Sequence, residues 1–497
     1  MLFSAVVETS TRVGSTRSRT AKVAALAAML ASAAGDELEI LAHYLSGSLR
    51  QRRTGVGWRS LVARPEPAAE PGLTLVEVDA AFAELALLAG TGSQTTRQQL
   101  LGELMARATA AEQSFLSGLL TGETRQGASE GLLLPAIASA FDVPLEAVRR
   151  AAMFAGSIPV VAVAAQAGGE PALEAITLQV GRPVLPMLAA SAPTIAEALD
   201  RFGPGTAVAV EAKLDGIRIQ VHREGDAVTV YSRSLDDITA RLPRVVAAAA
   251  ELPARRLVLD GEALALRPDG RPMLFQDTAS AGAALRPFFF DLLHLDDLDL
   301  VDEPFSSRQA RLAELAPADL LVDRVVTADL SAAEAFSQTV LAAGHEGVVI
   351  KSLDGGYAAG RRGAGWVKVK PVHTLDLVVL AVEWGSGRRR GWLSNIHLGA
   401  RDPDNGGFVM LGKTFKGMTD QMLSWQTERF LALETSRKGP VVFVRPEQVV
   451  EVAFDGIQRS TRYPGGMALR FARVVRYRED KTADEADTVS TVRALAG

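Results

Sequence analysis

The sequence predicts a multidomain protein with an all-α N-terminal domain, an α+β middle domain and a small C-terminal β-barrel. Up to about residue 170, apolar residues recur at three-to-four spacing, as in "TRQQLLGELMARATAAEQSFLSGLL", which is typical of packed helices. From about residue 206 the period changes to two, in runs such as "IRIQVHR" and "RLVLDGEALAL". After a break at "KPVHT", many short strands and one helix expected over about 419–434 favour a barrel. We therefore predict domains at 1–175, 176–371 and 372–497.

The bulk composition is that of a soluble globular protein. The chain has 497 residues, of which 48% are apolar and 22% charged. No unbroken apolar run reaches the ~18–20 residues that span a bilayer. The N-terminal stretch is expected to be an amphipathic helix rather than a signal or transit segment, because it contains Glu8 and lacks a cleavage-like site. We expect a linker over 179–194 and an exposed acidic tail over "DKTADEADTVSTVRALAG".

Composition also excludes several kinds of site. The chain has no cysteine, which removes disulfides, thiolate metal sites and cysteine nucleophiles. Its six histidines are scattered without metal-ligand spacing, so a histidine-bound zinc is not expected. The net charge of −5 gives no global attraction to nucleic acid, and any such binding must come from local basic patches.

One motif fits a phosphate-binding loop by its letters but not by its physics. "GFVMLGKT" (407–414) satisfies G-x-x-x-x-G-K-[ST], a loop that needs flexible backbone in the middle and a helix starting at the lysine. Here the four middle residues are typical of a strand, and residues 415–417 do not start a helix well. We predict that Lys413 is a basic residue at a strand end.

Lys213 lies at the head of the stretch "EAKLDGIRIQVHR". Alone, it is best explained as a solvated lysine at a strand end. The alternation that follows places three apolar residues on one face of a strand and Arg218, Gln220 and His222 on the other.

Further strands repeat the pattern of a β run that ends in a charged residue. They contribute Arg233 in "YSRS", Glu262 in "LVLDGE", Glu346 and Lys351 in "EGVVIK", and Lys368 and Lys370 in "WVKVK". Such a mixture of two acids with several bases suits a polyphosphate and a divalent metal better than a glycosidic or peptide bond.

Chemistry gives this cluster a specific use. A lysine is a nucleophile only when deprotonated, and its unperturbed pKa is ~10.4, which burial and neighbouring cations would lower. Attack on the α-phosphorus of a nucleoside triphosphate would give a lysine–nucleotide phosphoramidate. The departing pyrophosphate would need metal and positive charge, and the two carboxylates could bind a hard cation such as Mg²⁺.

At these residues the sequence resembles the covalent nucleotidyltransferases, specifically the ATP-dependent DNA ligases of bacterial, actinobacterial type. Six motifs occur in the family's order: "KLDG", "SRSLDDIT", "LDGE", "FFFDLL", "EGVVIK" and "WVKVK". "LRFARVVRYREDK" (469–481) resembles the sixth numbered motif of that family, and "FLSGLLTGETRQGASEGLLLPAIASAF" resembles the DNA-binding domain of the larger ligases. The resemblance implies an all-α DNA-binding domain, an α+β nucleotidyltransferase (adenylation) domain and a C-terminal OB-fold barrel.

The resemblance also implies a role for each site residue. Lys213 would be the adenylated lysine. The other implied roles are Glu211 against the adenine, Arg218 and Arg233 on phosphate and sugar, Glu262 on ribose or metal, Phe290 stacked on adenine, Glu346 on metal, and Arg362, Lys368 and Lys370 on the nucleotide phosphates. Phe288 or Phe289 could take the place of Phe290, which could instead be a core strand residue. Arg361 could replace Arg362, since "GRRGAGW" is expected to be loop.

Basic residues favour DNA as the partner. Five bases fall within 470–481, "GSGRRRGW" and "GKTFKG" add basic turns, and the segments 48–58 and 122–127 place arginines beside glycines. Such residues contact phosphate without reading bases. With the resemblance they imply a cytoplasmic, nucleoid-associated monomer that closes around nicked duplex DNA, independent of sequence, with ATP as AMP donor and Mg²⁺ or Mn²⁺.

Three alternatives remain to be weighed. An RNA ligase or an mRNA capping guanylyltransferase would share the chemistry, but the helical N-terminal domain and "REDK" favour a DNA ligase. NAD⁺ as donor is disfavoured, because that ligase class uses a cysteine-bound zinc module. A non-catalytic DNA-binding clamp is opposed by the intact Lys213, Glu262, Glu346 and Lys368.

Overall fold

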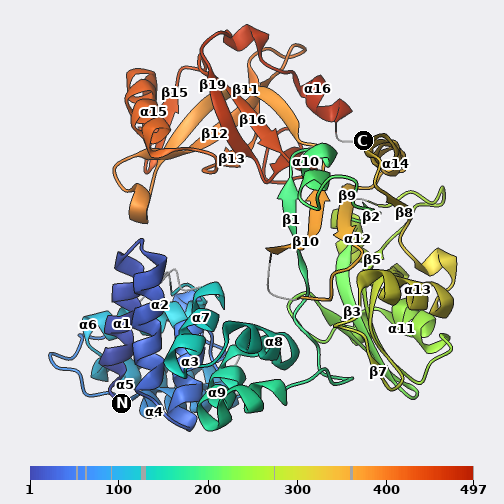
Figure 1. Ribbon diagram of the computed structural model, residues 1–497. Helices are drawn as coiled ribbons and strands as arrows, with labels where there is room; N and C mark the ends of the chain where they lie inside the picture. The colour runs from blue at the N-terminus through green and yellow to red at the C-terminus, as the bar shows by residue number, and fades with distance from the viewer. Residues whose placement is uncertain are drawn as a thin grey trace. The chain divides into compact units, whose positions relative to one another are not determined.

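The computed structural model describes residues 1–51, 54–61, 64–90, 92–124, 130–273, 275–358 and 362–495. The chain divides into two compact units, shown as a ribbon in Figure 1. The first contains residues 1–190, 201–336 and 349–367, and the second contains 191–200, 337–348 and 368–497. Among the described residues, no helix has both the length and the apolar character that crossing a membrane requires.

The N-terminal part of the first unit is helical, as predicted. Its helices are α1 (Phe3–Ser15), α2 (Arg19–Ala31), α3 (Asp36–Ser46), α4 (Leu75–Leu87), α5 (Ser93–Arg107), α6 (Ala110–Thr121), α7 (Glu130–Ala140), α8 (Leu145–Ala155) and α9 (Ile158–Glu174). Thr74 and Thr109 each form a capping box with the glutamate three residues later, which fixes the starts of α4 and α6. The buried ring of Phe3 contacts Tyr44 and Phe115 at the centre of the helical core.

The middle of the chain alternates strands and helices. The elements are β1 (Leu188–Ala192), α10 (Ile195–Asp200), β2 (Val208–Lys213), β3 (Ile217–Glu224), β4 (Ala227–Ser232), α11 (Pro243–Ala250), β5 (Arg256–Leu264), α12 (Phe275–Ala281), β6 (Arg286–Leu295), β7 (Leu298–Asp299), α13 (Phe305–Leu315), β8 (Arg324–Thr327), α14 (Leu330–Ala342), β9 (Gly347–Ser352) and β10 (Arg362–Val369). They make two five-stranded sheets, ordered β1-β10-β9-β2-β8 and β4-β3-β5-β6-β7. The α+β prediction is confirmed, but residues 362–366, within the expected loop "GRRGAGW", belong to β10.

The alternation predicted for β3 decides what each face of the second sheet does. Ile219 and Val221 are buried in a core with residues of α11 and α13, which cover one face of this sheet (Figure 1). Arg218, Gln220 and His222 lie on the opposite face. One strand thus supplies both a hydrophobic core and a row of polar side chains.

The expected linker is held along that polar face. His222 Nδ1 accepts a hydrogen bond from the Gly181 backbone N–H at 3.0 Å, so its other ring nitrogen, Nε2, carries the proton and donates to Gln220 Oε1. The Gln220 amide bonds both backbone groups of Val184, and Arg218 Nη1 donates to the Met187 carbonyl at 3.0 Å. The segment from Gly181 to Met187 is therefore a fixed part of the first unit.

The second unit is rich in strands and contains one long helix at the predicted place. Its elements are β11 (His373–Trp384), β12 (Leu393–Arg401), β13 (Phe408–Thr414), α15 (Asp420–Ala432), β14 (Glu434–Lys438), β15 (Val441–Val444), β16 (Val449–Phe454), β17 (Gly456–Arg459), β18 (Met467–Arg470), β19 (Arg473–Arg478) and α16 (Val489–Ala494). The long strand β11 pairs with β12, β15 and β16 in one seven-stranded sheet. The strand pairs among the described residues do not by themselves close this sheet into a barrel.

The expectation of an exposed acidic tail is wrong. The C-terminal helix α16 buries Val489 and Val492 in the core of the second unit. Asp487 also exchanges hydrogen bonds with Asp376: its N–H donates to the Asp376 carbonyl, and its carboxylate accepts from the Asp376 N–H. Two buried apolar residues and these hydrogen bonds together hold a segment whose composition is mostly polar.

The backbone of the second unit is tightly packed at Gly417. Gly417 has φ +84°, and an added Cβ would lie 2.1 Å from the Val474 carbonyl oxygen. Gly406 has φ +76° with no atom within 4 Å of the added Cβ, so it is a matched control for backbone strain alone. We expect Gly417→Ala to destabilise β13 and β19 by about 2 kcal/mol more than Gly406→Ala, measured by hydrogen exchange of peptides from both strands. Equal losses for the two variants would contradict this packing.

Candidate active site

Lys213 ends β2 and is followed by a tight turn into β3. Gly216 in this turn lies so close to β5 that an added Cβ would meet the Ala263 carbonyl oxygen at 2.4 Å, so only glycine fits. The Gly216 N–H donates to Glu262 Oε1 at 3.2 Å, and Glu262 is the direct cross-strand neighbour of Arg218. The "KLDG" and "LDGE" segments are thus brought together as the sequence predicts.

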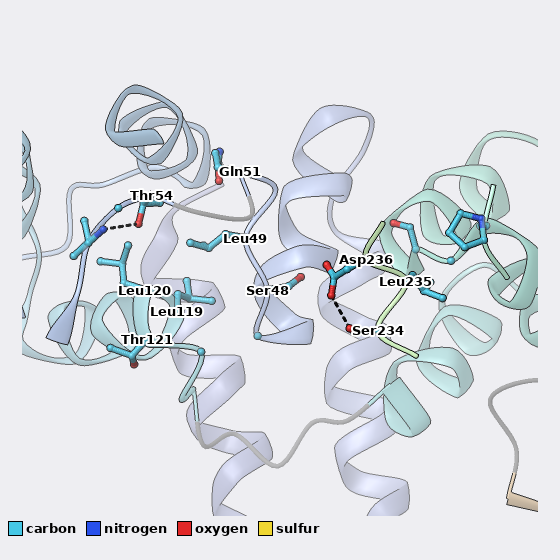
Figure 2. Close-up of a pocket in the computed structure, with 18 of the residues that line it drawn as sticks. Ser48, Leu49, Gln51, Thr54, Leu119, Leu120, Thr121, Ser234, Leu235 and Asp236 are labelled. Atoms are coloured by element: carbon cyan, nitrogen blue, oxygen red, sulfur yellow. Dashed lines mark hydrogen bonds between the residues drawn. The ribbon is translucent and has the colours of Figure 1, made fainter. Parts of the chain in front are cut away.

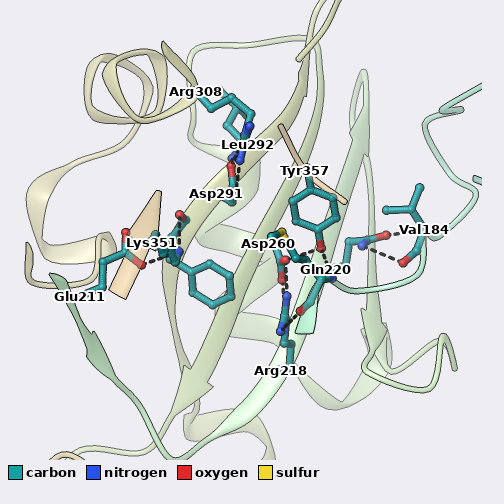
Figure 3. Close-up of polar contacts among 12 residues, drawn as sticks. Val184, Glu211, Arg218, Gln220, Asp260, Asp291, Leu292, Arg308, Lys351 and Tyr357 are labelled. Carbon is teal, nitrogen blue, oxygen red and sulfur yellow. Dashed lines mark hydrogen bonds and ion pairs between the residues drawn. The ribbon is translucent and has the colours of Figure 1, made fainter. Parts of the chain in front are cut away.

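Glu211 shares a strand face with Lys213, two residues away, and is almost fully buried (Figure 3). Its Oε1 accepts from Arg324 Nε at 2.8 Å, and its Oε2 pairs with Lys351 Nζ at 2.5 Å. Lys351 is itself only 1% exposed. Burial lowers the pKa of Lys351, and Glu211 opposes this shift.

Aromatic rings surround the Lys351 ammonium. Its Nζ lies 4.1 Å from the ring centroid of Trp366, 4.5 Å from Phe290 and 4.7 Å from Phe305. These distances are those of cation–π contacts. Phe290 and Trp366 also meet edge to face at 5.9 Å between centroids.

The strand register shows why Phe290, and not Phe289, faces this cluster. Asp260 pairs with Asp291, but the next residue, Gly261, pairs with Phe289, so Phe290 is the extra residue of a β-bulge. Phe289 is fully buried in the hydrophobic core on the other side of the sheet. Of the alternatives left by the sequence, Phe289 is therefore a core residue.

Arg218 is held by Asp260, which is held in turn by Tyr357. Arg218 Nε and Nη2 donate to the two oxygens of Asp260 at 2.9 and 2.6 Å, and its guanidinium lies 5.2 Å from the Phe290 ring. The Tyr357 hydroxyl donates to Asp260 Oδ2 at 2.7 Å and accepts from the Met187 N–H at 2.9 Å. Burial alone would lower the pKa of Arg218, but Asp260 outweighs it and the pKa is raised. Arg218 is therefore a permanent cation with a fixed orientation.

Glu262, an acid beside Arg218, has a raised pKa. Burial raises its pKa to about 7, although the positive charges of Arg218 and Lys213 oppose the shift. Near neutral pH the carboxyl is thus divided between its neutral and ionised forms, and a cation bound beside it would favour the ionised form.

Three predicted residues, Glu346, Lys368 and Lys370, belong to the second unit. There, Lys370 Nζ donates to Glu346 Oε1 at 3.0 Å and also pairs with Asp455. Burial would lower the pKa of Lys370, but these two carboxylates outweigh it and raise the pKa. Glu346 directly precedes β9, and Lys368 lies in β10.

Arg233, Arg362 and the bases of the segment 470–481 remain from the prediction. Arg233 is exposed just after β4. Arg362 begins β10, but its side chain and the whole of Arg361 lie outside the described part of the chain. The bases of the segment 470–481 mostly have acidic partners in the second unit: Arg473 with Asp455, Arg476 with Glu451, and Arg478 and Lys481 with Asp376.

Several residues that complete the site were not singled out from the sequence. They are Asp260, Asp291, Arg308, Arg324, Tyr357 and Trp366. Arg308 and Asp291 form a fully buried bidentate ion pair. Arg308 Nε donates to Asp291 Oδ1 at 2.7 Å, and Arg308 Nη2 donates to Asp291 Oδ2 at 3.0 Å. Asp260 and Asp291 lie inside "LDGE" and "FFFDLL", so an acid following an apolar run was an available signal for both.

Lys413 is not part of a phosphate-binding loop. It lies in β13, its ammonium pairs with Glu383 of β11, and the next helix begins only at Asp420. Glu383 also accepts from His397 Nε2 at 2.9 Å and from Asn395 Nδ2 at 2.7 Å. The prediction of a strand lysine is confirmed.

An open pocket of about 1140 Å³ lies in the first unit between loops of the helical region and the turn after β4 (Figure 2). Ser48, Gln51 and Gly122 line it, so both glycine-and-arginine segments chosen from the sequence, 48–58 and 122–127, contribute to one pocket. Ser234 and Asp236, from the segment "SRSLDDIT", line the opposite side. Arg52, Arg53 and Arg125 lie outside the described residues.

The carboxylates expected to bind metal do not form a closed ligand cluster. Within the described ranges, no group of three or more histidine, cysteine, aspartate or glutamate side chains is placed to hold a metal ion. Glu262 and Glu346 lie in different units. The donor set of the first unit, two cations beside one carboxylate and aromatic rings, fits a nucleotide phosphate and base better than a resident metal.

Comparison with known proteins agrees with a nucleotide-binding site in the middle of the chain. Residues 59–138 match the family model "DNA ligase N terminus", 186–370 match "ATP dependent DNA ligase domain", and 389–481 match "ATP dependent DNA ligase C terminal region". The chain is 62% identical to a probable DNA ligase of Nocardioides sp. over all of this chain and 99% of that protein. It is 60% identical to a probable DNA ligase of Beutenbergia cavernae over the full length of both.

A solved structure named Pmar-Lig_PreS3 has the same fold. It is 18% identical, with a TM-score of 0.64 over 95% of this chain and 99% of that one.

His222, on the same strand face as Arg218, predicts acid sensitivity. Burial, with a smaller contribution from His294, lowers its pKa from 6.5 to about 3. A depressed histidine pKa gives stability that is complete above pH 6.5 and lost as pH falls toward 3, at about 1.4 kcal/mol per unit. We expect the wild type to lose about 2 kcal/mol more than His222→Gln in the β3–β5 region between pH 7 and pH 5. Hydrogen exchange of β3 peptides measures this, and parallel losses in both proteins would refute it.

Proposed function

Because the chain belongs to the ATP-dependent DNA ligase family, we propose that it seals 5′-phosphate/3′-hydroxyl nicks in duplex DNA. The reaction would pass through a lysine–AMP intermediate and an adenylated DNA end. The observation that carries this proposal is how five residues are linked. Arg218 lies over Phe290 and opposite Glu262, and Lys351 contacts both Phe290 and Glu211. The charge of Lys213 acts on Glu262, where it opposes the rise in pKa that burial causes. Together these residues offer a nucleophile, a fixed cation, a carboxylate and an aromatic ring to one nucleotide.

In the first step Lys213 Nζ, in its unprotonated form, attacks the α-phosphorus of ATP. A P–N bond forms, the bond to the bridging oxygen of the leaving group breaks, pyrophosphate departs and the amine loses its proton. Arg218 would contact the α-phosphate with a guanidinium that is already oriented, so little reorganisation opposes the growth of negative charge. Glu211 would lie against the adenine and Phe290 would stack on it.

In the second step the 5′-phosphate at the nick attacks the same phosphorus, the P–N bond breaks, and AMP passes to the DNA end. In the third, the 3′-hydroxyl attacks the adenylated 5′-phosphate, a phosphodiester forms and AMP leaves. Arg233, Arg362, Lys368 and Lys370 would contact phosphates and sugar during these steps. Mg²⁺ or Mn²⁺ would enter with the nucleotide and screen its phosphate charge, with Glu262 as the carboxylate beside it.

We propose three domains for this work: a DNA-binding domain over 1–175, an adenylation domain over 176–371 and an OB-fold over 372–497. The OB assignment is supported by two hydrogen bonds between the end of β13 and the start of β19. The Val474 N–H donates to the Lys416 carbonyl at 2.9 Å, and Thr414 Oγ1 donates to the Ala472 carbonyl at 2.5 Å. These bonds join edge strands whose pairing would close a barrel.

Nicked duplex DNA is the proposed partner of the helical part, bound by a single copy of the chain. The pocket of Figure 2 supports this, since its wall contains Gly47, Gly122 and Gly156, each with positive φ at a helix end. Glycines permit close approach of a phosphate backbone, and basic segments adjoin them in the sequence. Contacts of this kind do not distinguish bases.

The adenylation step gives the first test. Lys213→Ala should abolish covalent labelling by ATP with Mg²⁺, because no other described side chain occupies the position of the nucleophile. Mass spectrometry of the intact enzyme after incubation with ATP should find one AMP on wild type and none on the variant. Lys413→Ala is the control, and it should label at close to the wild-type rate. ATP-dependent labelling of the Lys213→Ala protein, or labelling by GTP in preference to ATP, would contradict the proposal.

Salt dependence gives the second test. Binding through phosphates releases counterions, so affinity for a nicked duplex should fall at least about 100-fold between about 50 and 200 mM salt, as roughly four phosphate contacts require. Fluorescence anisotropy with two nicked duplexes of unrelated sequence measures this. The two slopes should coincide. A flat salt dependence, or a strong preference for one sequence, would argue against duplex binding through the backbone.

A further inference from the structure

The hydrogen bonds around Arg218 form a closed ring of four residues. Arg218 donates to both oxygens of Asp260, and Asp260 accepts from the Tyr357 hydroxyl. Tyr357 in turn accepts from the Met187 N–H, and the Met187 carbonyl accepts from Arg218 Nη1. Figure 3 shows Asp260 between Tyr357 and Arg218. Each member is therefore fixed by two others.

The ring leaves part of the guanidinium available. An arginine carries five N–H donors, and the described contacts use three of them: one on Nε, one on Nη2 and one on Nη1. Each Nη atom keeps one further N–H, and guanidinium N–H groups bind the oxygens of a phosphate.

Tyr357 is the member of this ring that no part of the proposed mechanism uses. Its hydroxyl is buried, and burial together with the neighbouring Asp260 carboxylate raises its pKa, so it stays a neutral donor. The segment that carries it is held independently, because Arg308 Nη1 donates to the Gly355 carbonyl at 3.1 Å and the Tyr357 N–H donates to the Val301 carbonyl at 2.7 Å. The position of the hydroxyl is thus set from outside the ring.

We propose that Tyr357 is a positioning residue for the phosphate contact of Arg218. Through Asp260 and Met187 it fixes the plane of the guanidinium, so that the two remaining donors meet the α-phosphate in the adenylation step. This inference rests on the proposed function, which assigns Arg218 to the nucleotide phosphate. Tyr357 does not itself touch the nucleotide.

Removing only the hydroxyl should leave binding and fold largely intact but slow the chemistry. Tyr357→Phe keeps the ring packed edge to face against Trp366 at 6.1 Å. Without the hydroxyl, Asp260 loses a donor and the Met187 N–H loses its acceptor, so the guanidinium is less well oriented. We expect the single-turnover rate of Lys213 adenylation at saturating ATP to fall about ten-fold, since small misplacements of a catalytic contact have effects of this order.

A matched control is available on the neighbouring strand. The Tyr231 hydroxyl donates to the Gly181 carbonyl at 2.6 Å and so tethers the same 181–187 segment without contacting Asp260. Tyr231→Phe makes the same chemical change and should leave the adenylation rate within about two-fold of wild type. Melting temperatures of both variants show whether either loses the fold. Equal rates for the two variants would overturn the proposal.

Two further measurements distinguish a positioning role of Tyr357 from a general loss of structure. If Tyr357 acts through Arg218, Tyr357→Phe should have less than about a two-fold effect in an Arg218→Gln background, where the oriented guanidinium is already gone. The preference between the two diastereomers of ATPαS, in which sulfur replaces one or the other non-bridging α-oxygen, should shrink in Tyr357→Phe as it does in Arg218→Gln. Arg218→Lys replaces Arg218→Gln if the latter fails to fold.

The outcomes distinguish this inference from the function beneath it. A full ten-fold effect of Tyr357→Phe in the Arg218→Gln background, or an unchanged ATPαS preference, overturns the inference and leaves the ligase proposal standing. Wild-type adenylation by Arg218→Gln overturns the role of Arg218 and the inference with it. Absence of AMP on wild-type Lys213 overturns the proposed function itself.

Discussion

The buried ion pair between Arg218 and Asp260 is the constraint on which the rest of the site depends. Removing two charges from water costs several kcal/mol per ion unless geometry and further hydrogen bonds compensate. Here the pair is bidentate, and the Tyr357 hydroxyl donates a further hydrogen bond to one Asp260 oxygen. The Met187 carbonyl accepts a hydrogen bond from a third N–H of the guanidinium. The segment that contains Met187 and the segment that carries Tyr357 must therefore both stay in place for this charge pair to remain satisfied.

The same requirement recurs on the neighbouring strands. Glu211 is shared by Arg324 and Lys351, and Asp291 is bound by Arg308, with none of these acids reaching solvent appreciably. Cations held in such surroundings interact with a phosphate more strongly than solvated ones, and they need no reorientation. An exposed ion pair of the second unit is different in kind: Arg476, which pairs with Glu451, is 63% exposed, and pairs of that sort contribute about 1 kcal/mol or less.

Local patterns in the sequence predicted which side chains share a face of a strand. They did not predict which distant residues contact those side chains. Alternation alone placed Arg218, Gln220 and His222 together, and the structure confirms that row. Asp260 is 42 residues from Arg218, and Tyr357 is 97 from Asp260, so their contacts depend on strand pairing and loop packing that no short pattern specifies. The tail prediction was wrong for a related reason: two apolar residues of α16 outweigh an acidic composition once a core is available to receive them.

Stability alone is a poor explanation for the Arg218–Asp260 pair. Replacing a buried ion pair by apolar residues of similar size is often neutral or stabilising by about 1–4 kcal/mol. Arg218 lies over Phe290 and Trp366, and an apolar residue at its position could not present N–H donors to a ligand there. The costly arrangement is understandable if the quantity being maintained is the orientation of the guanidinium rather than the free energy of unfolding. The conformation of the segment at Met187 then depends on the site, because the Met187 N–H and carbonyl both form hydrogen bonds within the ring.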